Sequence, residues 1–313
     1  MNIIVTGSAG FIGSSLVDKL LLQGHFVLGI DNFDTYYDRT TKEKNISGHI
    51  KNPNYKFLEA DLLNPEKIKP HLKKDFQIII HLAAKAGVRP SLENPALYQR
   101  VNVEGTQNVI NLAAEFNIKK IIFAGSSSVY GINPNLPWKE SDINLMPISP
   151  YASSKIAAEW IGKTLCNMSD FDFISLRFFT VFGPRQRPDL AINSFFRKIS
   201  AGEPITVFGD GSTIRDYTYI DDIVDGIIGV IVNYNQKGYN VFNFGSNHPI
   251  KLLDMIKAVE ETVGIKAKIN YTTMQKGDAP KTFSDSSKAR EAFGFQPKIS
   301  FKEGIKRYYD WLK

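Results

Sequence analysis

The sequence predicts an α/β fold, a doubly wound parallel sheet with a smaller mixed α/β lobe. Three observations support this prediction. Short, wholly apolar runs alternate with helix-like runs over the first 130 residues, which is typical of parallel strands covered by helices on both faces. A glycine-rich turn joins the first apolar run to the first helical run. The 313 residues also exceed what one core usually serves, so a second lobe is expected.

The expected strands are short and apolar, and most are followed by a helical segment. They lie at residues 2–7, 25–31, 55–62, 76–84, 119–127 and 172–183. The expected helices carry apolar residues at helical spacing. They lie at residues 11–24, 102–117, 151–168 and 301–313.

The composition of the chain changes near residue 183, where a stretch rich in Pro and Arg and several charged loops begin. We therefore expect residues 1–182 to form the sheet domain. Residues 239–246 (YNVFNFGS) are typical of one more strand, so residues 217–246 are expected to return to that domain. The smaller lobe then takes residues 183–216 and 247–313.

Charge and cysteine content narrow the class of protein. A net charge of +6 suits an anionic small ligand as well as nucleic acid, but no run of five basic residues occurs, and no nucleic-acid partner is expected. The single cysteine, Cys166, excludes an internal disulfide and a cysteine-rich metal site. No metal is therefore expected. We also see no signal-peptide pattern and no apolar run of about 18 residues, and expect a cytoplasmic protein without a membrane partner.

The segment GSAGFIG (7–13) lies between the first strand and the first helix, where a phosphate-binding turn belongs. Gly7 permits the sharp turn, Gly10 lets the backbone approach a pyrophosphate, and Gly13 lets the helix and strand pack closely. The helix N-terminus then faces the negative charge. This context predicts dinucleotide binding.

Asp31 ends the second strand, at the position where an acid meets the adenosine ribose. A carboxylate accepts hydrogen bonds from both ribose hydroxyls and repels a 2′-phosphate. The residues that follow, Asn32, Phe33 and Asp34, include no arginine, so NAD is favoured over NADP. Asp61 follows the third strand, where it either reaches the adenine or only ends the strand as a turn carboxylate.

The segment SPYASSK (149–155) carries a tyrosine and a lysine four residues apart, Tyr151 and Lys155, which would share one helix face. Pro150 suits the start of that helix. A free tyrosine has a pKa of about 10 and is a poor base at neutral pH, but a nearby ammonium favours the phenolate. Downstream of a dinucleotide motif and of the hydroxyl cluster 126–128, the pair is interpreted as catalytic rather than as an ordinary surface pair.

Seven features together resemble the extended short-chain dehydrogenase/reductase (SDR) superfamily. They are GSAGFIG, Asp31, Asp61, HLAA (81–84), Asn102 in RVNVEGT, SSSVYG and YASSK. Three later stretches, FFTVFGPRQRPDLA, VFGDGSTIRDYTYIDD and KGDAPKTFSDSSKAREAFGF, are similar to its nucleotide-sugar 4-epimerases. The resemblance covers almost the whole chain. It implies a Rossmann-type sheet, a bound NAD that is not consumed, and a homodimer in which the helices around 100–116 and 151–168 pair into a four-helix bundle.

The resemblance also implies the reaction, inversion of C4 of a UDP-hexose. Tyr151 would take the proton from the sugar 4-hydroxyl while hydride moves from C4 to the nicotinamide. The 4-keto sugar would turn over, and the hydride would return to its other face. Ser126 would bond the 4-oxygen, and Lys155 would hold the nicotinamide ribose and tune Tyr151. Related dehydratases and decarboxylases carry acids near Ser127 and Ser128, and a serine cannot supply an acid's proton at neutral pH.

Further binding residues follow from the same matching. For the cofactor they are Gly7, Gly10, Phe11, Ile12, Gly13, Asp31, Asn32, Asp61, Leu62, Leu82, Ala83, Ala84, Asn102, Tyr151 and Lys155. For the substrate they are Ser127, Ser128, Thr180, Arg187, Val207, Phe208, Arg215 and Asp278. Val207 and Phe208 would pack the uracil, Arg215 would pair with the diphosphate, and Asp278 would bind the uridine ribose. Phe208 could equally be a core residue, and Arg215 could pair with Asp216.

Two departures from the glucose-type enzymes bear on the sugar. Thr180 stands where those enzymes often carry Asn, and Gln275 where they often carry Arg. The stretches FFTVFGPRQRPDLA and NFDTYYDRTTKEKN look more like UDP-glucuronate 4-epimerases, with Thr180, Ser127, Ser128 and Arg187 around the C6 carboxylate. UDP-glucuronate and UDP-galacturonate are therefore expected, in a pathway such as polysaccharide biosynthesis. UDP-glucose/UDP-galactose or an N-acetylated sugar is the alternative, and a dehydratase or decarboxylase is less favoured.

Overall fold

A computed structural model describes residues 1–274 and 277–313, which form two units. The first unit comprises residues 1–131, 145–177 and 234–242. Its centre is a seven-stranded sheet with the order β10-β6-β5-β4-β1-β2-β3. The strands are β1 (Asn2–Thr6), β2 (Phe26–Asp31), β3 (Tyr55–Glu59), β4 (Ile78–His81), β5 (Lys120–Ser126), β6 (Asp172–Phe178) and β10 (Tyr239–Phe244).

The sheet is doubly wound, as predicted. Strands β3, β2, β1, β4 and β5 pair in parallel register, with Val5 opposite Gly29 on one side and opposite Ile80 on the other. The chain runs outward from β1 to β2 and β3, then returns to β4 on the other side of β1. This reversal is the topological switch point at which such sheets bind ligands, beyond the carboxyl ends of the strands.

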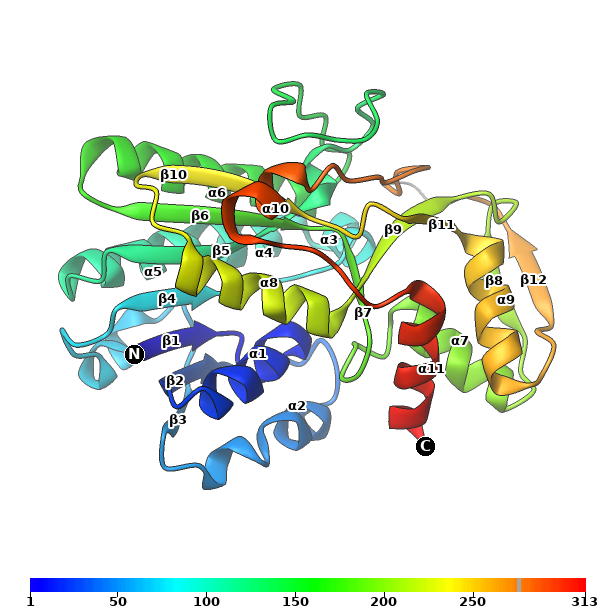
Figure 1. Cartoon of the computed structure of the whole chain (residues 1–313), viewed down its shortest axis with the longest axis horizontal. Coiled ribbons are helices and arrows are strands. Elements are labelled where there is room, and N and C mark those ends of the chain that lie inside the picture. Colours follow the sequence, from blue (N-terminus) through cyan, green and yellow to red (C-terminus); the bar gives the residue numbers. More distant parts are fainter. Residues whose placement is uncertain (275–276) are drawn as a thin grey trace. The chain divides into compact units, whose positions relative to one another are not determined.

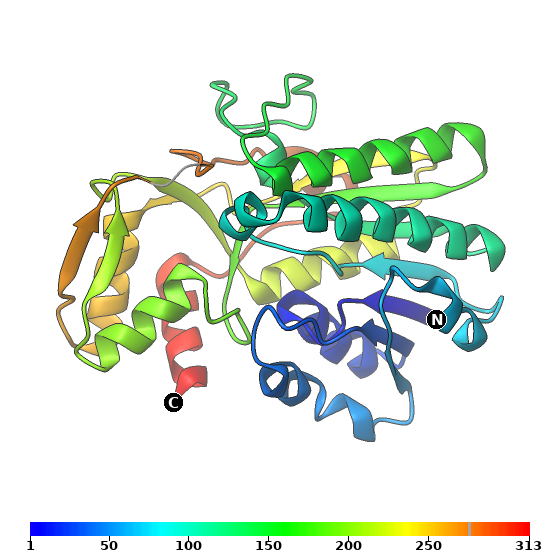
Figure 2. The same cartoon turned by 180° about the vertical axis from the view of Figure 1, so that it is seen from behind.

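Helices cover both faces of this sheet: α1 lies on one face, and α5 and α6 lie on the other (Figures 1 and 2). Buried residues of the strands and of α5 and α6, among them Ile79, Ile121, Val109 and Ala158, form one apolar core. The helices are α1 (Phe11–Leu22), α2 (Arg39–Ile46), α3 (Val88–Glu93), α4 (Pro95–Gln99), α5 (Gly105–Glu115) and α6 (Pro150–Met168). Short 3₁₀ turns are η1 (His49–Lys51), η2 (Pro65–Lys67), η3 (Lys69–His71) and η5 (Ser127–Val129), and η4 (Arg100–Glu104) is a π turn.

The start of α6 follows from local chemistry. The Ser149 side chain accepts a hydrogen bond from the Ala152 amide, and Pro150 occupies the first turn, where its missing N–H costs nothing. The helix begins one residue earlier than expected. It carries Tyr151 and Lys155 on its first two turns.

The second unit comprises residues 132–144, 178–233 and 243–313. It holds a three-stranded sheet, β11-β9-β7, and a two-stranded sheet, β12-β8. Its strands are β7 (Thr180–Phe182), β8 (Ile205–Phe208), β9 (Ile214–Tyr219), β11 (Pro249–Lys251) and β12 (Ile269–Thr272). Its helices are α7 (Ala191–Ser200), α8 (Ile220–Asn233), α9 (Leu252–Val263), α10 (Ser287–Phe293) and α11 (Phe301–Leu312). Helices α7 and α9 pack on each other beside β8 and β12 (Figure 1).

The contacts divide the chain differently from the expected boundaries at four places. Residues 132–144, 178–182, 217–233 (which include α8) and 243–246 group with the second unit, whereas all four were expected in the sheet domain. The reason for α8 is packing: Gly226 on this helix lies directly against Phe295 and Phe244, both of the second unit. Of the helices in the part of the chain that the structure describes, none is long and apolar enough to cross a membrane.

Candidate active site

The glycine-rich turn after β1 leaves the N-terminus of α1 open. Gly7 has a φ of +71°, in the region that side chains disfavour, and a Cβ there would lie 2.8 Å from the Ala83 amide nitrogen. A Cβ on Gly13 would lie 2.1 Å from the Gly7 carbonyl oxygen. The N-cap, Gly10, offers no side chain to the first amides of α1, and the first turn carries no acid. This end of the helix is therefore suited to an anion such as a pyrophosphate.

Asp31 lies at the end of β2 with its side chain buried. One carboxylate oxygen accepts a hydrogen bond from the Ala9 amide at 3.2 Å, so the acid is tied to the glycine-rich turn. The other accepts from the Phe33 amide at 2.9 Å and from the Lys42 ammonium at 3.1 Å. The Lys42 side chain is only 8% exposed. Sequence reasoning missed Lys42, which lies on α2, eleven residues after the acid, outside any local motif.

Asn32 and Asp61 meet beyond β2 and β3. The Asn32 side-chain amide donates to Asp61 at 2.9 Å, and the other Asp61 oxygen accepts from the Leu63 amide at 2.8 Å. Asp61 therefore does form the turn considered as its alternative role. Because Asn32 directly follows Asp31, this bond also keeps Asp61 close to Asp31.

Asn102 fastens the segment after β4 to α6. Its side-chain oxygen accepts from the Lys85 amide at 2.8 Å, and its nitrogen donates to the Lys85 carbonyl at 3.0 Å and to the Ser154 hydroxyl at 2.9 Å. The residue lies in the π turn η4, a type of helical irregularity frequent at functional sites. It thereby holds Lys85, which directly follows the predicted cofactor-binding stretch 82–84, while the Leu82 and Ala83 amides donate to the Thr6 carbonyl and hydroxyl, each at 3.2 Å. No sequence signal indicated the π turn.

Lys155 is buried and points at the sheet. Its ammonium donates to the Ala124 carbonyl at 2.9 Å and lies 4.8 Å from the centre of the Phe123 ring. Burial lowers the pKa of Lys155 to about 8, although the Glu159 carboxylate opposes that shift. Burial, with a smaller effect of the Lys155 charge, lowers the pKa of His81 to about 3. His81 is therefore a neutral ring at neutral pH, bonded to Thr6 at 2.7 Å and to Thr106 at 3.1 Å.

Tyr151 lies one turn before Lys155, half-buried, with its ring edge-on to Tyr98 at 6.2 Å between centres. The helix that carries both residues packs against β5 and against the serine turn η5. In that turn the Ser126 and Ser128 hydroxyls bond each other at 2.8 Å, and Ser126 accepts from the Ser128 amide. Helix α6, which carries Tyr151 and Lys155, thus packs directly on the serine turn η5.

The predicted substrate residues outside the serine turn all belong to the second unit. Arg187 forms a two-bond pair with Asp189, at 3.0 and 2.9 Å, so its guanidinium already has an anionic partner. Val207 is fully buried on β8, while its neighbour Phe208 is partly exposed. Asp278 is also partly exposed. Gln275 lies outside the described residues.

Arg215 and its neighbour Asp216 have different partners. The two oxygens of the fully buried Asp216 accept bonds from the Ser246 and Ser284 amides and hydroxyls and from the Asn247 amide. This carboxylate therefore holds three segments of the second unit together. Arg215 donates to the Ile214 carbonyl at 2.9 Å and is partly exposed.

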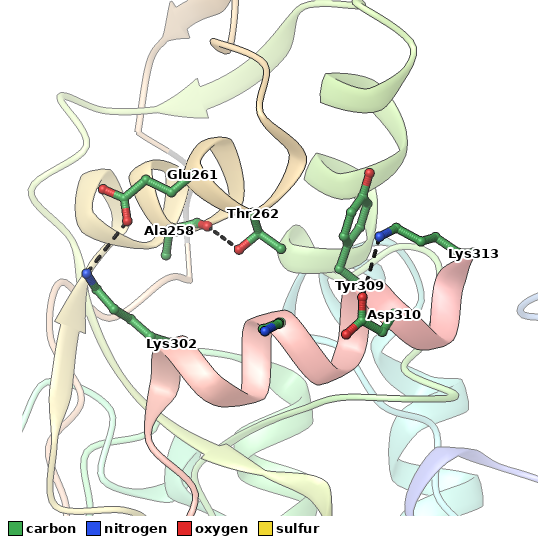
Figure 3. Close-up of a pocket in the computed structure, with 8 residues that line it drawn as sticks. Ala258, Glu261, Thr262, Lys302, Tyr309, Asp310 and Lys313 are labelled. Carbon is green, nitrogen blue, oxygen red and sulfur yellow. Dashed lines mark hydrogen bonds and ion pairs between the residues drawn. The ribbon is translucent and has the colours of Figure 1, made fainter.

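A pocket of about 350 Å³ opens between α9 and α11, within the second unit (Figure 3). The charged side chains that line it form ion pairs among themselves: Lys302 lies 3.6 Å from Glu261, and Lys313 lies 3.5 Å from Asp310. Because no predicted site residue lines it, this pocket is not the candidate active site. Among residues 1–274 and 277–313, no group of three or more His, Cys, Asp or Glu side chains could hold a metal ion.

The chain is similar to sugar-nucleotide epimerases over its whole length. It is 40% identical to a UDP-glucuronate 4-epimerase of Thermodesulfobacterium geofontis, over 99% of this chain and 95% of that protein. A crystal structure of UDP-glucuronic acid 4-epimerase from Bacillus cereus, in complex with UDP-glucuronic acid and NAD, superposes with a TM-score of 0.94. It is 33% identical and covers 100% of this chain and 99% of that one.

A second solved structure, UDP-glucose 4-epimerase from Thermotoga maritima, superposes with a TM-score of 0.91 at 31% identity, covering 100% of this chain and 98% of that one. The NAD-dependent epimerase/dehydratase family matches residues 3–245, which include β1 to β10 and every residue of the proposed catalytic group. The resemblance to extended SDR enzymes is thereby confirmed: this chain belongs to the NAD-dependent epimerase/dehydratase family.

Proposed function

We propose that the protein is an NAD-dependent UDP-glucuronate 4-epimerase that interconverts UDP-glucuronate and UDP-galacturonate. The observation that carries the proposal is the packing of α6, with Tyr151 and the buried Lys155, against a serine turn that contains no acid. The full-length similarity to a UDP-glucuronate 4-epimerase supports the same conclusion.

The residues of the first unit suit NAD. The open N-terminus of α1 is complementary to its pyrophosphate, and the buried Asp31 carboxylate to its adenosine ribose. Lys42 is a further candidate for the ribose hydroxyls, because its ammonium lies on the same carboxylate. When bound, NAD supplies the hydride acceptor and donor at the sugar C4.

The side chains of α6 and of the serine turn move the proton. Tyr151, as a phenolate, removes the proton from the 4-hydroxyl and gives it back after the sugar has turned over. Lys155 places a positive charge one turn away on the same helix, which favours the phenolate. Ser126 donates a hydrogen bond to the 4-oxygen. Ser127 and Ser128 offer hydroxyls but no carboxylic acid, so elimination of water lacks its acid and the 4-keto sugar is reduced again.

The second unit is proposed to bind the UDP moiety through Val207, Phe208, Arg215 and Asp278. The buried Val207 side chain can contribute packing and its backbone, whereas Phe208 and Arg215 have exposed surface for the ligand. For the C6 carboxylate we propose Thr180, Arg187, Ser127 and Ser128. Arg187 already binds a carboxylate, that of Asp189, in the two-bond geometry that a substrate carboxylate would require.

The test is the product formed from each of a panel of UDP-sugars, read by NMR. The expected result is interconversion of UDP-glucuronate and UDP-galacturonate, with NAD carried through purification and no net NADH. Preferential turnover of UDP-glucose or UDP-N-acetylglucosamine would support the epimerase activity but show that the substrate is another UDP-sugar. Loss of water or carbon dioxide from the sugar would overturn the epimerase itself.

We also propose a cytoplasmic homodimer that serves polysaccharide biosynthesis. The exposed face of α6 carries Trp160, 54% exposed, and Met168, 77% exposed, which are large apolar groups to leave in water. Sedimentation of the protein and of Trp160→Glu tests the dimer. A wild-type protein that sediments as a monomer at micromolar concentration would refute it.

A further inference from the structure

A buried ion pair lies behind the proposed catalytic group. Glu159 and Arg177 are 2% and 4% exposed, and their carboxylate and guanidinium form two bonds, at 3.1 and 2.7 Å. The Ser175 hydroxyl donates to the same carboxylate at 2.8 Å. Burying two charges costs several kcal/mol for each ion, and an apolar pair of the same volume often folds as well or better. Stability alone is therefore a poor explanation for the pair.

The pair reaches both elements of the catalytic group. Glu159 lies four residues after Lys155 on α6, so the two side chains share a helix face. Arg177 also donates to the Tyr130 hydroxyl at 2.9 Å, and Tyr130 is the C-terminal cap of the serine turn η5. One guanidinium thus links the helix of Tyr151 and Lys155 to the turn of Ser126–Ser128.

The strand that leads into the serine turn is fitted to the same carboxylate. Gly125 immediately precedes Ser126, and a Cβ at this position would lie 3.0 Å from a Glu159 oxygen and 2.6 Å from the Ser175 hydroxyl. A side chain at position 125 would therefore collide with the Ser175 hydroxyl and press on the Glu159 carboxylate, so the glycine lets β5 run beside the ion pair.

The charges around Lys155 give Glu159 a second effect. The groups that face the ammonium from neighbouring elements are the Ala124 carbonyl, the Phe123 ring and the neutral His81. On its own helix the facing groups are Tyr151 and Glu159, and Glu159 is the anion among these groups. Its charge raises the pKa of Lys155 against the effect of burial, which leaves that pKa at about 8.

We propose that Glu159, held by Arg177, is a positioning residue of the epimerase, which fixes the serine turn through Tyr130 and supplies the negative charge that keeps Lys155 protonated. The proposal rests on the epimerase activity proposed above. Glu159 thus has two proposed effects, one on the charge of Lys155 and one on the position of the serine turn, and a separate variant tests each.

Glu159→Gln tests the effect of charge, since it keeps the shape of the side chain and removes the anion. The probe is protein with NAD and no sugar, labelled with ε-¹³C lysine, in which the Lys155 signal is identified by its absence from Lys155→Met. We expect the titration midpoint of Lys155 to fall by about one pH unit. The alkaline limb of kcat against pH should move down with it.

Two matched controls accompany this variant. Ser175→Ala removes one bond to Glu159 but no charge, and Asp172→Asn removes another buried acid, which holds the Gly238 amide. Neither should move the Lys155 midpoint. If Glu159→Gln does not fold, the double change Glu159→Met with Arg177→Met removes both charges together, so that neither is left buried alone. A smaller downward shift is then expected, because loss of the guanidinium acts in the opposite direction.

Tyr130→Phe tests the effect of position, because it removes only the hydroxyl that Arg177 bonds. We expect kcat to fall about tenfold, the KM for UDP-glucuronate to stay within twofold, and the alkaline limb to stay where it is. Unchanged kcat would overturn the role in position.

An unchanged Lys155 midpoint in Glu159→Gln would overturn the role in charge. This outcome is distinct from failure of the proposed function. A wild-type protein that epimerises no UDP-sugar refutes the function, while the NMR titration still decides whether Glu159 sets the charge of Lys155.

Discussion

The proposed catalytic residues and the proposed substrate-binding residues of the second unit are held in different ways. Lys155, Ser126 and the ion pair behind them are buried, and each bonds a neighbour within the first unit. Arg187 of the second unit bonds Asp189, whose side chain is 39% exposed, and Phe208 and Asp278 are partly exposed. Catalytic groups must keep a fixed position, which buried side chains with bonded neighbours provide, whereas the partly exposed side chains of the second unit can exchange partners when a ligand binds.

The largest effect is expected from Tyr151→Phe, which keeps the ring and removes the proton-transferring oxygen. We expect kcat to fall about 10³-fold, within the usual range for a general acid–base group, while NAD binding is retained. The measurement is product formation from UDP-glucuronate by NMR, with bound NAD quantified separately. Full activity in this variant would show that the catalytic group lies elsewhere.

Lys155→Met should stabilise the protein, since the native state buries this charge at a cost. Below pH 8 the lysine is protonated in both states and the cost is complete. Between pH 8 and about 10.5 only the unfolded state binds the proton, so this group's contribution to stability rises with pH. The gain in unfolding free energy at pH 7 should be up to about 3 kcal/mol, and it should shrink toward pH 10.

Urea unfolding without NAD at pH 7 and pH 9.5 measures this gain. Lys42→Met is the matched control, because Lys42 has a buried anionic partner, Asp31, that the substitution leaves unpaired. It should lower stability. A Lys155→Met protein that is less stable than wild type at pH 7 would show that the buried charge of Lys155 does not lower the free energy of unfolding.

Gly13→Ala should damage cofactor binding, because its Cβ would lie 2.1 Å from the Gly7 carbonyl oxygen. Overpacking of this kind costs about 1–3 kcal/mol, and it would displace the turn that faces the pyrophosphate. Calorimetric titration of NAD into protein freed of its bound cofactor measures the loss of affinity. Gly48→Ala, with no atom within 4 Å of the new Cβ, is the control and should bind NAD normally.

The smallest effect is expected from Arg187→Gln and should appear as altered selectivity. We expect kcat/KM for UDP-glucuronate to fall about tenfold, the equivalent of one charge-assisted hydrogen bond, with little change for UDP-glucose. Asp189→Asn, which removes the negative charge of the carboxylate that Arg187 binds, should leave UDP-glucuronate turnover intact or raise it. An equal fall in kcat/KM for both UDP-sugars would mean that Arg187 does not distinguish the C6 carboxylate from the C6 hydroxymethyl group.

The sequence predicted best what depends on neighbours along the chain. The start of α6 beside Pro150, within one residue, the glycine-rich turn before α1 and the acid that ends β2 each follow from a few adjacent residues, and the structure has all three. The doubly wound sheet followed from mostly apolar strands separated by helices.

Contacts between distant parts of the chain were not predictable in this way. Lys42 reaches Asp31 from another helix, and Arg177 reaches Glu159 from a strand whose other residues are mostly apolar. The grouping of α8 with the second unit depends on Gly226 packing against aromatic side chains from later segments. A pattern of apolar residues shows that such a helix is buried, but not against which partner.

The π turn at Arg100–Glu104 has a consequence for how this part of the chain can vary in length. A π turn holds more residues per turn than the α-helix on either side of it. Removing one residue there would restore regular helix with the flanking turns in nearly the same orientation, because a π turn accommodates one extra residue locally, but it would displace the residues within the turn. Asn102 would then lose its three bonds to Lys85 and Ser154 at once. Substitutions on the surface of these helices can accumulate, but a single-residue deletion cannot, so the length of this segment is constrained more tightly than its composition.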